Sequence, residues 1–309
     1  MSRRGWLLFI AMCVIWGIPY LLIKVAIGEL APSTLVLART ALATLLLLPI
    51  ALARGQVRPL LPRWLPLLAF ALVEICAPWL LLGFAEQHIS SSLTGLLVAA
   101  VPLVGAVLAR FSGDHEPLGA RRTVGLLAGI AGVAALVGFE VGATDVRAVL
   151  AVGVVAVCYA VGPVILSRSL SDLPGLAVIA VSLGVAALLY VPAGIAQAPD
   201  HWPSAKVVGS VLVLAVVCTA VAFLVFFQLI AEVGPARSTV ITYVNPAVAV
   251  LLGVVVLDES FTAATAAGFV LILGGSVLAT SRARAAAPRP APSAAEVECA
   301  DLAAPIAEP

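Results

Sequence analysis

Apolar residues dominate long stretches of this chain, and polar residues gather in the short segments between them. A helix needs about 20 apolar residues to cross the roughly 30 Å of hydrocarbon in a bilayer. Ten runs approach that length, which predicts an all-α integral membrane protein with ten transmembrane helices. The predicted spans are 6–27, 31–52, 64–84, 89–110, 122–139, 147–167, 175–196, 207–230, 234–257 and 262–279.

Composition supports this class and excludes others. Residues of the AVILMFWYC set make up 62% of the chain and charged residues 11%, whereas soluble domains carry about a quarter charged residues. A formal net charge of +1 offers no basic surface for nucleic acid. The connections are too short for a soluble catalytic domain, and no metal-ligand, phosphate-loop or nucleophile motif is present. We therefore expect no enzyme, no cofactor and no metal, with a lipid bilayer as the surrounding partner.

The ends of the chain and its basic residues predict the topology. The opening MSRRGWLLF resembles a secretory signal, but no small-residue cleavage site follows, so we interpret it as the start of the first helix. An N-terminus in the cytoplasm leaves most lysines and arginines on the cytoplasmic side, and an even number of spans returns the C-terminus there. We expect a multi-pass protein of the cytoplasmic membrane with both termini inside. The Ala/Pro-rich tail, 281–309, is predicted to be disordered.

The sequence also repeats itself at one offset. Five pairs of residues lie 143 positions apart: Trp16 and Tyr159, Pro49 and Pro192, Glu116 and Glu259, Gly125 and Gly268, and Gly132 and Gly275. Each half then holds an odd number of spans, so the second half enters the membrane upside down relative to the first. Inverted repeats of this kind are typical of secondary transporters. We predict a first five-helix repeat over 1–140 and an inverted second repeat over 141–280.

Two prolines interrupt corresponding spans. Pro102 pairs with Pro246 at an offset of 144, and each removes a backbone N–H and can kink its helix. Asn245, beside Pro246, is a polar group placed either to meet a solute or to satisfy the loosened backbone.

Several motifs together resemble one known family. They are IWGIPY with Trp16 and Gly17, Arg39, VPLVGAVLA leading to Glu116, TVGLLAGIAGVAAL, CYA with Tyr159, YVNPAVAVLLGVVVLDES and AAGFVLILGGSVL. Over nearly all of residues 6–280 the chain resembles the EamA-type members of the drug/metabolite transporter superfamily. The resemblance implies secondary transport of a small metabolite across the cytoplasmic membrane, most often export of an amino acid or related compound. Arg39 is not repeated in the second half of the chain, where the corresponding residue is Ser182.

Polar and aromatic groups from different helices fall at one depth. Counting at about 1.5 Å per residue places five residues near the midpoints of their spans: Trp16, Glu74, Tyr159, Thr219 and Asn245. Their common level predicts a central cavity that binds a small-molecule solute.

Glu74 is the sharpest of these signals, because a carboxylate at mid-bilayer is costly and normally faces a cavity or a partner. One interpretation makes Glu74 a proton carrier whose protonation competes with or accompanies solute binding. The other gives it a structural hydrogen bond or an ion pair with Arg39.

Arg39 lies in the outer half of its helix, where its guanidinium can hold a substrate carboxylate through two hydrogen bonds. A pair with Glu74 or a role in fixing the fold is the alternative. Trp16 and Tyr159 could likewise flank a solute with their rings or pack between helices.

Other features have structural interpretations. Gly125, Gly129 and Gly132, with Gly268 and Gly275, are expected to form close packing faces of the fifth and tenth spans. Glu116 and Glu259 are expected to interact with the starts of those same two helices. Lys24, near the end of its span, is expected to extend to the membrane interface.

Three alternatives to metabolite export stay open at this point. Efflux of drugs or lipophilic cations would also use a mid-membrane carboxylate with aromatic neighbours. A membrane-embedded enzyme acting on a lipid should cluster acids or histidines at one interface. A receptor would bind its ligand without accumulating it. Nothing in the sequence determines whether the protein forms a homo-oligomer.

Overall fold

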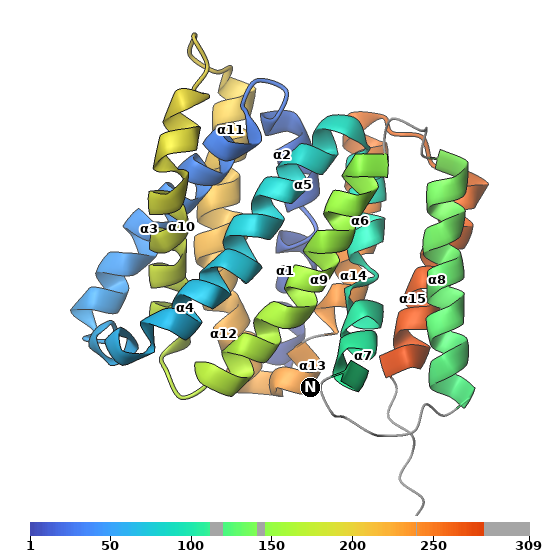
Figure 1. Cartoon of the computed structure of the whole chain (residues 1–309), viewed down its shortest axis with the longest axis horizontal. Coiled ribbons are helices and arrows are strands. Elements are labelled where there is room, and N and C mark those ends of the chain that lie inside the picture. Colours follow the sequence, from blue (N-terminus) through green and yellow to red (C-terminus); the bar gives the residue numbers. More distant parts are fainter. Residues whose placement is uncertain (112–119, 141–145, 239, 281–309) are drawn as a thin grey trace, which may run out of the picture.

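The computed structural model describes residues 1–111, 120–140, 146–238 and 240–280. All regular structure in these residues is helical, and the helices pack side by side in one bundle (Figure 1). The first half of the chain contains α1 (Arg3–Ile15), α2 (Pro19–Ala26), α3 (Pro32–Ala53), the 3₁₀ helix η1 (Arg58–Arg63), α4 (Trp64–Phe70), the π-helical turn η2 (Ala71–Cys76), α5 (Ala77–His88), α6 (Ser91–Val98), α7 (Val101–Phe111) and α8 (Ala120–Glu140). The second half contains α9 (Val146–Ser169), α10 (Gly175–Ala196), α11 (Ala205–Ala215), the π-helical turn η4 (Val216–Val221), α12 (Ala222–Val233), α13 (Pro235–Ser238), α14 (Ile241–Leu257) and α15 (Ala263–Thr280).

Seven helical segments are long and apolar enough to cross a membrane, judged by length and composition. They are Arg3–Ala26, Pro32–Ala53, Arg58–His88, Ser91–Leu108, Val146–Ser169, Gly175–Ala196 and Ala205–Val233. The helices α8, α14 and α15 occupy the places of the other predicted spans. The all-α membrane class is therefore confirmed, while the count of ten spans stays a prediction.

The first span is broken in its middle. Pro19 has no N–H and its ring excludes a regular helix before it, so α1 ends at Ile15 and α2 begins anew. The N–H groups of Gly17 and Ile18 both donate to the carbonyl of Val14, at 3.0 and 3.1 Å. The carbonyl of Cys13 thereby loses its usual helical donor and needs another partner inside the membrane.

Asn245 supplies that partner. With its amide nitrogen turned toward the neighbouring carbonyls, Asn245 donates to Cys13 O at 3.1 Å and to Ile241 O at 3.0 Å. The Cys13 carbonyl belongs to the break in the first span and not to the backbone beside Pro246, and a contact of Asn245 with a solute stays a prediction.

The two prolines of the predicted kinks behave differently. The fourth span breaks between Val98 and Val101, immediately before Pro102, so that α6 and α7 are separate helices. Helix α14 continues through Pro246.

Helices α3 and α10 pack antiparallel along one edge of the bundle, at the left of Figure 1. Thr34, in the first turn of α3, donates through Oγ1 to Gly194 O at 3.0 Å and Gln197 O at 3.1 Å, at the end of α10. Farther along α3, Thr44 lies opposite Gly184. The start of one helix therefore meets the end of the other.

Helices α8 and α15 form a second antiparallel pair at the opposite edge (Figure 1). A Cβ on Gly125 would lie 2.8 Å from the carbonyl oxygen of Gly275, and one on Gly132 would lie 3.0 Å from that of Gly268. Only glycine allows the two backbones to come this close, and the extra dispersion contacts stabilise the pair in lipid. The predicted glycine packing face is confirmed.

Glu259 contacts a different helix from the one predicted. Its carboxylate accepts hydrogen bonds from Ser91 N at 2.8 Å and Ser92 N at 2.9 Å, and so caps the start of α6 rather than the tenth span. Partial burial raises the pKa of Glu259, but the hydrogen bonds from Ser92 and Ser91 outweigh it, and the pKa lies below its ordinary value. The prediction was wrong because it considered only the helix that follows Glu259 in the sequence. The N-terminus of α6, in the first half of the chain, is the one that Glu259 contacts in space. Glu116 lies outside the described residues.

The Lys24 side chain lies at the end of α5, and its predicted extension to the membrane interface stays a prediction. Its ammonium donates to the carbonyls of Glu86 and Ile89, the latter at 2.8 Å. A cation at the C-terminal end of α5 satisfies carbonyls that have no partner within that helix.

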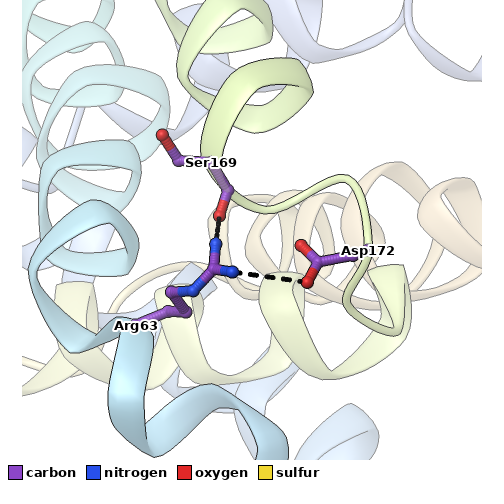
Figure 2. Close-up of polar contacts among 3 residues, drawn as sticks. All are labelled: Arg63, Ser169 and Asp172. Carbon is purple, nitrogen blue, oxygen red and sulfur yellow. Dashed lines mark hydrogen bonds and ion pairs between the residues drawn. The ribbon is translucent and has the colours of Figure 1, made fainter.

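The end of the bundle that carries the N-terminus has its own contact between the halves. Arg63 donates through Nη1 to Ser169 O at 2.7 Å, and its Nη2 lies 3.5 Å from Asp172 Oδ2 (Figure 2). Both side chains are well exposed, at 45% and 63%, so the ion pair adds at most about 1 kcal/mol.

Adjacent glycines in α15 provide a test of the packing. We expect Gly275→Ala to lower the thermal stability of the protein in detergent, by an overpacking cost of about 1–3 kcal/mol, because its Cβ would meet the backbone of Gly125 and Gly129. Gly274 has open space around the same position, so Gly274→Ala should leave stability unchanged or raise it. Equal melting temperatures for the two variants would contradict the close approach of α8 and α15.

Candidate functional site

Two π-helical turns place polar side chains inside the bundle. Turn η2 interrupts the segment Arg58–His88, and turn η4 interrupts Ala205–Val233 at the corresponding place. Glu74 is the fourth residue of η2 and Thr219 is the fourth residue of η4. Single π turns inside longer helices occur frequently at functional sites, because the extra residue frees backbone groups and redirects side chains.

Thr219 holds Arg39 in the interior. Arg39 Nε donates to Thr219 Oγ1 at 2.9 Å, and Thr219 Oγ1 in turn donates to Leu214 O at 2.8 Å. The Arg39 guanidinium also lies over the ring of Trp79, with its central carbon 3.6 Å from the ring centroid. A desolvated cation–π contact of this kind is worth about 2 kcal/mol.

Two tyrosines complete this part of the interior. Tyr20 on α2 and Tyr159 on α9 pack against one cluster of buried residues, and both lie close enough to Arg39 for its charge to act on them. Tyr159 also packs against the larger cluster that contains Trp79. The guanidinium of Arg39 is therefore surrounded by aromatic rings and hydroxyl groups.

Arg39 has no acidic partner in the described part of the chain. Its one hydrogen bond is to Thr219, and the only ion pair there joins Arg63 and Asp172. The predicted alternative of an Arg39–Glu74 ion pair is therefore wrong for this conformation. A buried guanidinium without an anion retains the capacity to bind one.

Glu74 lies on the other π turn, against α9. A Cβ added to Gly162 would overlap the Glu74 carboxylate, so the glycine makes room for the acid. Glu74 Oε2 is buried without a hydrogen-bond partner among the described residues. The charge of Glu74 also acts on Tyr159, which lies between the two π turns in the polar cluster.

The two π turns are packed in related ways. Helix α3 packs on η4 and brings Arg39 to Thr219, while α10 packs on η2 and carries Ser182, the repeat partner of Arg39. At the first crossing the Thr219 hydroxyl is satisfied, because it accepts from Arg39 and donates to Leu214 O. At the second crossing both Ser182 Oγ and Glu74 Oε2 are buried without partners among the described residues.

The remaining predicted site residues belong to the break in the first span. Trp16 packs against Phe226 and Phe223, with ring centroids 4.8 and 5.8 Å away, and Asn245 bonds the carbonyl of Cys13. The structure therefore joins Arg39, Thr219 and Tyr159, places Glu74 near Tyr159, and assigns Trp16 and Asn245 to helix packing in this conformation.

Sequence reasoning undervalued three members of this cluster. The site residues named from the sequence do not include Trp79, Tyr20 or Gly162. Trp79 follows Glu74 by little more than a turn, and Tyr20 follows Trp16 by one turn, so helical spacing was the available signal. Nothing in the sequence marked Gly162 as the neighbour of Glu74.

The described residues form an all-helical bundle with a buried, partly unsatisfied polar cluster, and the comparisons with known proteins indicate a membrane transporter rather than an enzyme. The model of the EamA-like transporter family matches residues 3–138 and again 146–281. The chain belongs to that family.

Individual relatives are also named as transporters. The uncharacterized transporter YvbV of Bacillus subtilis is 26% identical over 289 residues, which is 92% of this chain and 94% of YvbV. The uncharacterized inner membrane transporter YedA of Escherichia coli K12 is 30% identical over 253 residues, 79% of each chain. A solved crystal structure with 24% identity aligns at a TM-score of 0.65 over 90% of this chain and 98% of its own, which supports the fold.

Thr219 offers a test of the buried arginine. We expect Thr219→Val to reduce stability by about 1–3 kcal/mol, since the similarly shaped side chain leaves Arg39 Nε buried without an acceptor. Thr219→Ser keeps the hydroxyl oxygen and should unfold near the wild-type temperature. Thermal unfolding of the purified variants in detergent measures both. A Thr219→Val variant that unfolds at the wild-type temperature, or a Thr219→Ser variant that is the less stable of the two, would contradict the importance of the hydrogen bond to Arg39.

Proposed function

We propose that this protein is a secondary transporter that moves a small metabolite, an amino acid or related compound, out of the cell by alternating access. The observation that carries the proposal is Arg39, buried at mid-bundle with Thr219 and Trp79 as partners and with no acidic partner in the described residues. The solute would supply the missing anion as a carboxylate, which a guanidinium binds through two hydrogen bonds.

The aromatic groups define the rest of the proposed site. Tyr20, Trp79 and Tyr159 enclose the guanidinium, so a solute carboxylate would displace little water and meet a strong local field. The unpartnered oxygen of Glu74 offers a place for a solute ammonium group or for a proton. Such a pair of opposite charges suits a zwitterion.

Alternating access would use two inverted halves, 1–140 and 141–280. The antiparallel pairing of α3 with α10 and of α8 with α15 supports inversion, because each pair joins corresponding helices of the two halves. Contacts between the halves lie at both ends of the bundle: Glu259 on the start of α6 at one end, and Arg63 on Asp172 at the other. Breaking the contacts at one end of the bundle while those at the other end hold would open the polar cluster around Arg39 to one side of the membrane.

We further propose that Glu74 carries a proton in exchange for solute, and that the protein lies in the cytoplasmic membrane with both termini inside. The absence of hydrogen-bond partners on Glu74 Oε2 supports the first point, since a structural carboxylate would be satisfied. The distribution of basic residues supports the second.

Efflux of lipophilic cations is the second candidate, favoured by one observation. Glu74 lies beside Tyr159 and against a glycine, an arrangement in which a carboxylate and an aromatic face can bind a cation. In that case Glu74, and not Arg39, would be the recognition residue.

Comparison of metabolites in cells and medium distinguishes the candidates. Strains would produce the wild type, Arg39→Lys, Glu74→Ala, the control Glu232→Gln, or no transporter. Glu232 lies on the bundle surface beside Ser2, away from the polar cluster. We expect one carboxylate-bearing compound to accumulate in the medium with the wild type and the control, and Arg39→Lys to reduce that export at least tenfold.

A compound exported equally by Arg39→Lys and the wild type would remove Arg39 from recognition. An exported cation that depends on Glu74 alone would favour the second candidate. No difference in any small molecule, with the protein confirmed in the membrane, would contradict metabolite export.

Proton exchange is tested separately in vesicles. We expect an imposed pH gradient to accelerate solute uptake by the wild type and to have no effect on Glu74→Gln, because the amide cannot take up or release a proton. Glu74→Asp keeps a titratable group and should keep the response. Gradient-dependent uptake by Glu74→Gln would refute the assignment of the proton to this residue.

A further inference from the structure

A second polar layer lies nearer the end of the bundle opposite the N-terminus. Leu82 on α5 and Ala249 on α14 belong to one buried cluster. One helical turn farther along, at Glu86 and Gly253, the same two helices reach a layer that the start of α6 completes. In Figure 1 the end of α5, the start of α6 and the connection after α14 all lie along the upper edge, away from the end marked N.

This layer contains four buried oxygen atoms without hydrogen-bond partners among the described residues: both carboxylate oxygens of Glu86 and the hydroxyl oxygens of Ser91 and Ser92. Glu86 and Ser91 are 0% exposed and Ser92 is 3% exposed. An unpartnered buried carboxylate is costly, because it has lost its hydration and gained nothing in exchange.

The nearby lysine does not neutralise this acid. Lys24 donates to the backbone carbonyls of Glu86 and Ile89, and no ion pair joins it to the Glu86 carboxylate. The groups whose charges act on Glu86 are Lys24 and Glu259, and Glu86 itself acts on Tyr20. Lys24 and Glu259 are therefore the charged groups that an occupant of this layer would meet beside Glu86.

The two serine hydroxyl oxygens converge with a carboxylate oxygen of Glu259 beside a glycine. A Cβ added to Gly253 would touch Ser91 Oγ, Ser92 Oγ and Glu259 Oε2 together. Glu259 keeps its backbone donors at the start of α6, so its oxygens are fixed in place. The absence of a side chain at Gly253 leaves these oxygens facing one another across a small gap.

A cavity lies near this layer at the end of α5. It has a volume of about 330 Å³ and is lined by Lys24, Ile27, Gly28, Glu86, Gln87 and His88. The cavity borders Glu86, so only a short distance separates the buried acid from the surface.

We propose that Glu86, with Ser91, Ser92 and Glu259, binds one sodium ion between the two halves of the protein. Oxygen ligands from carboxylates and hydroxyls suit a hard cation, and a monovalent ion could replace the proton on a buried carboxyl group. The ion would provide the partner that the buried oxygens of Glu86, Ser91 and Ser92 lack.

The position of the site predicts what the ion does. Glu86, Ser91 and Ser92 come from the first half of the chain, and Glu259 comes from the second. A bound ion would strengthen the contact that holds this end of the bundle closed. Whether ion binding is coupled to solute movement rests on the proposed function, whereas binding itself does not.

Sodium binding is measured on the purified full-length protein in detergent, without any solute. We expect NaCl to raise the melting temperature above that in KCl or choline chloride at equal ionic strength, because an ion that binds the folded state stabilises it by mass action. Equilibrium binding of radioactive ²²Na⁺ should saturate near one ion per chain. Glu86→Gln should lose both the specific shift and the bound ion.

Glu232→Gln is the matched control, because Glu232 follows an alanine near the end of α12 as Glu86 follows one near the end of α5. It should keep both responses. Gel filtration establishes that Glu86→Gln is folded. If it is not, Ser92→Ala replaces it, and we expect that variant to bind sodium at least tenfold more weakly.

Three results would overturn the proposal. In the first, wild-type protein melts at the same temperature in sodium, potassium and choline and binds no ²²Na⁺. In the second, Glu86→Gln and Ser92→Ala bind sodium as the wild type does. In the third, stability follows pH through Glu86 with no sodium dependence, which would make the ligand a proton. None of these results depends on transport, so a failure here leaves the export proposal standing.

Discussion

The need to satisfy every backbone polar group inside the bilayer governs this structure. Lipid offers no hydrogen bonds, so a helix can be interrupted only where another part of the protein supplies the missing partner. The break before Pro19 illustrates the rule, because it leaves the carbonyl of Cys13 without a helical donor and the amide of Asn245 provides one. The polar residue that seemed out of place in an apolar helix therefore secures the irregularity of a helix far away in the sequence.

The π turns apply the same constraint to function. Each turn releases backbone groups, and at η4 the hydroxyl of Thr219 donates to the carbonyl of Leu214 while accepting from Arg39. The corresponding turn η2 carries Glu74, whose buried oxygen has no such partner in the described residues. Related packing thus produces one π turn whose side-chain hydroxyl has hydrogen-bond partners and one whose carboxylate oxygen has none among the described residues. This asymmetry explains why a nearly symmetric bundle can hold opposite charges at different places.

Much of the architecture was predictable because it depends on local properties. Apolar runs of sufficient length predict helices in a membrane, and the glycines Gly125, Gly132, Gly268 and Gly275 predict close packing, since only small residues let helices approach. The partners of individual charges were harder to predict. Glu259 caps α6 instead of the neighbouring tenth span, Lys24 bonds carbonyls at the end of α5, and Arg39 does not pair with Glu74.

The sequence by itself determined the membrane class, the family and the residues too polar to lie in lipid without a reason, because hydropathy, glycine spacing and short motifs are properties of neighbouring residues. Only the tertiary structure decided which of those polar residues meet. Hydrogen bonds act over about 3 Å, and the partners of Arg39, Asn245 and Glu259 lie on helices distant in sequence. A rotation of any one of these helices by a single residue would replace the partners that it contributes.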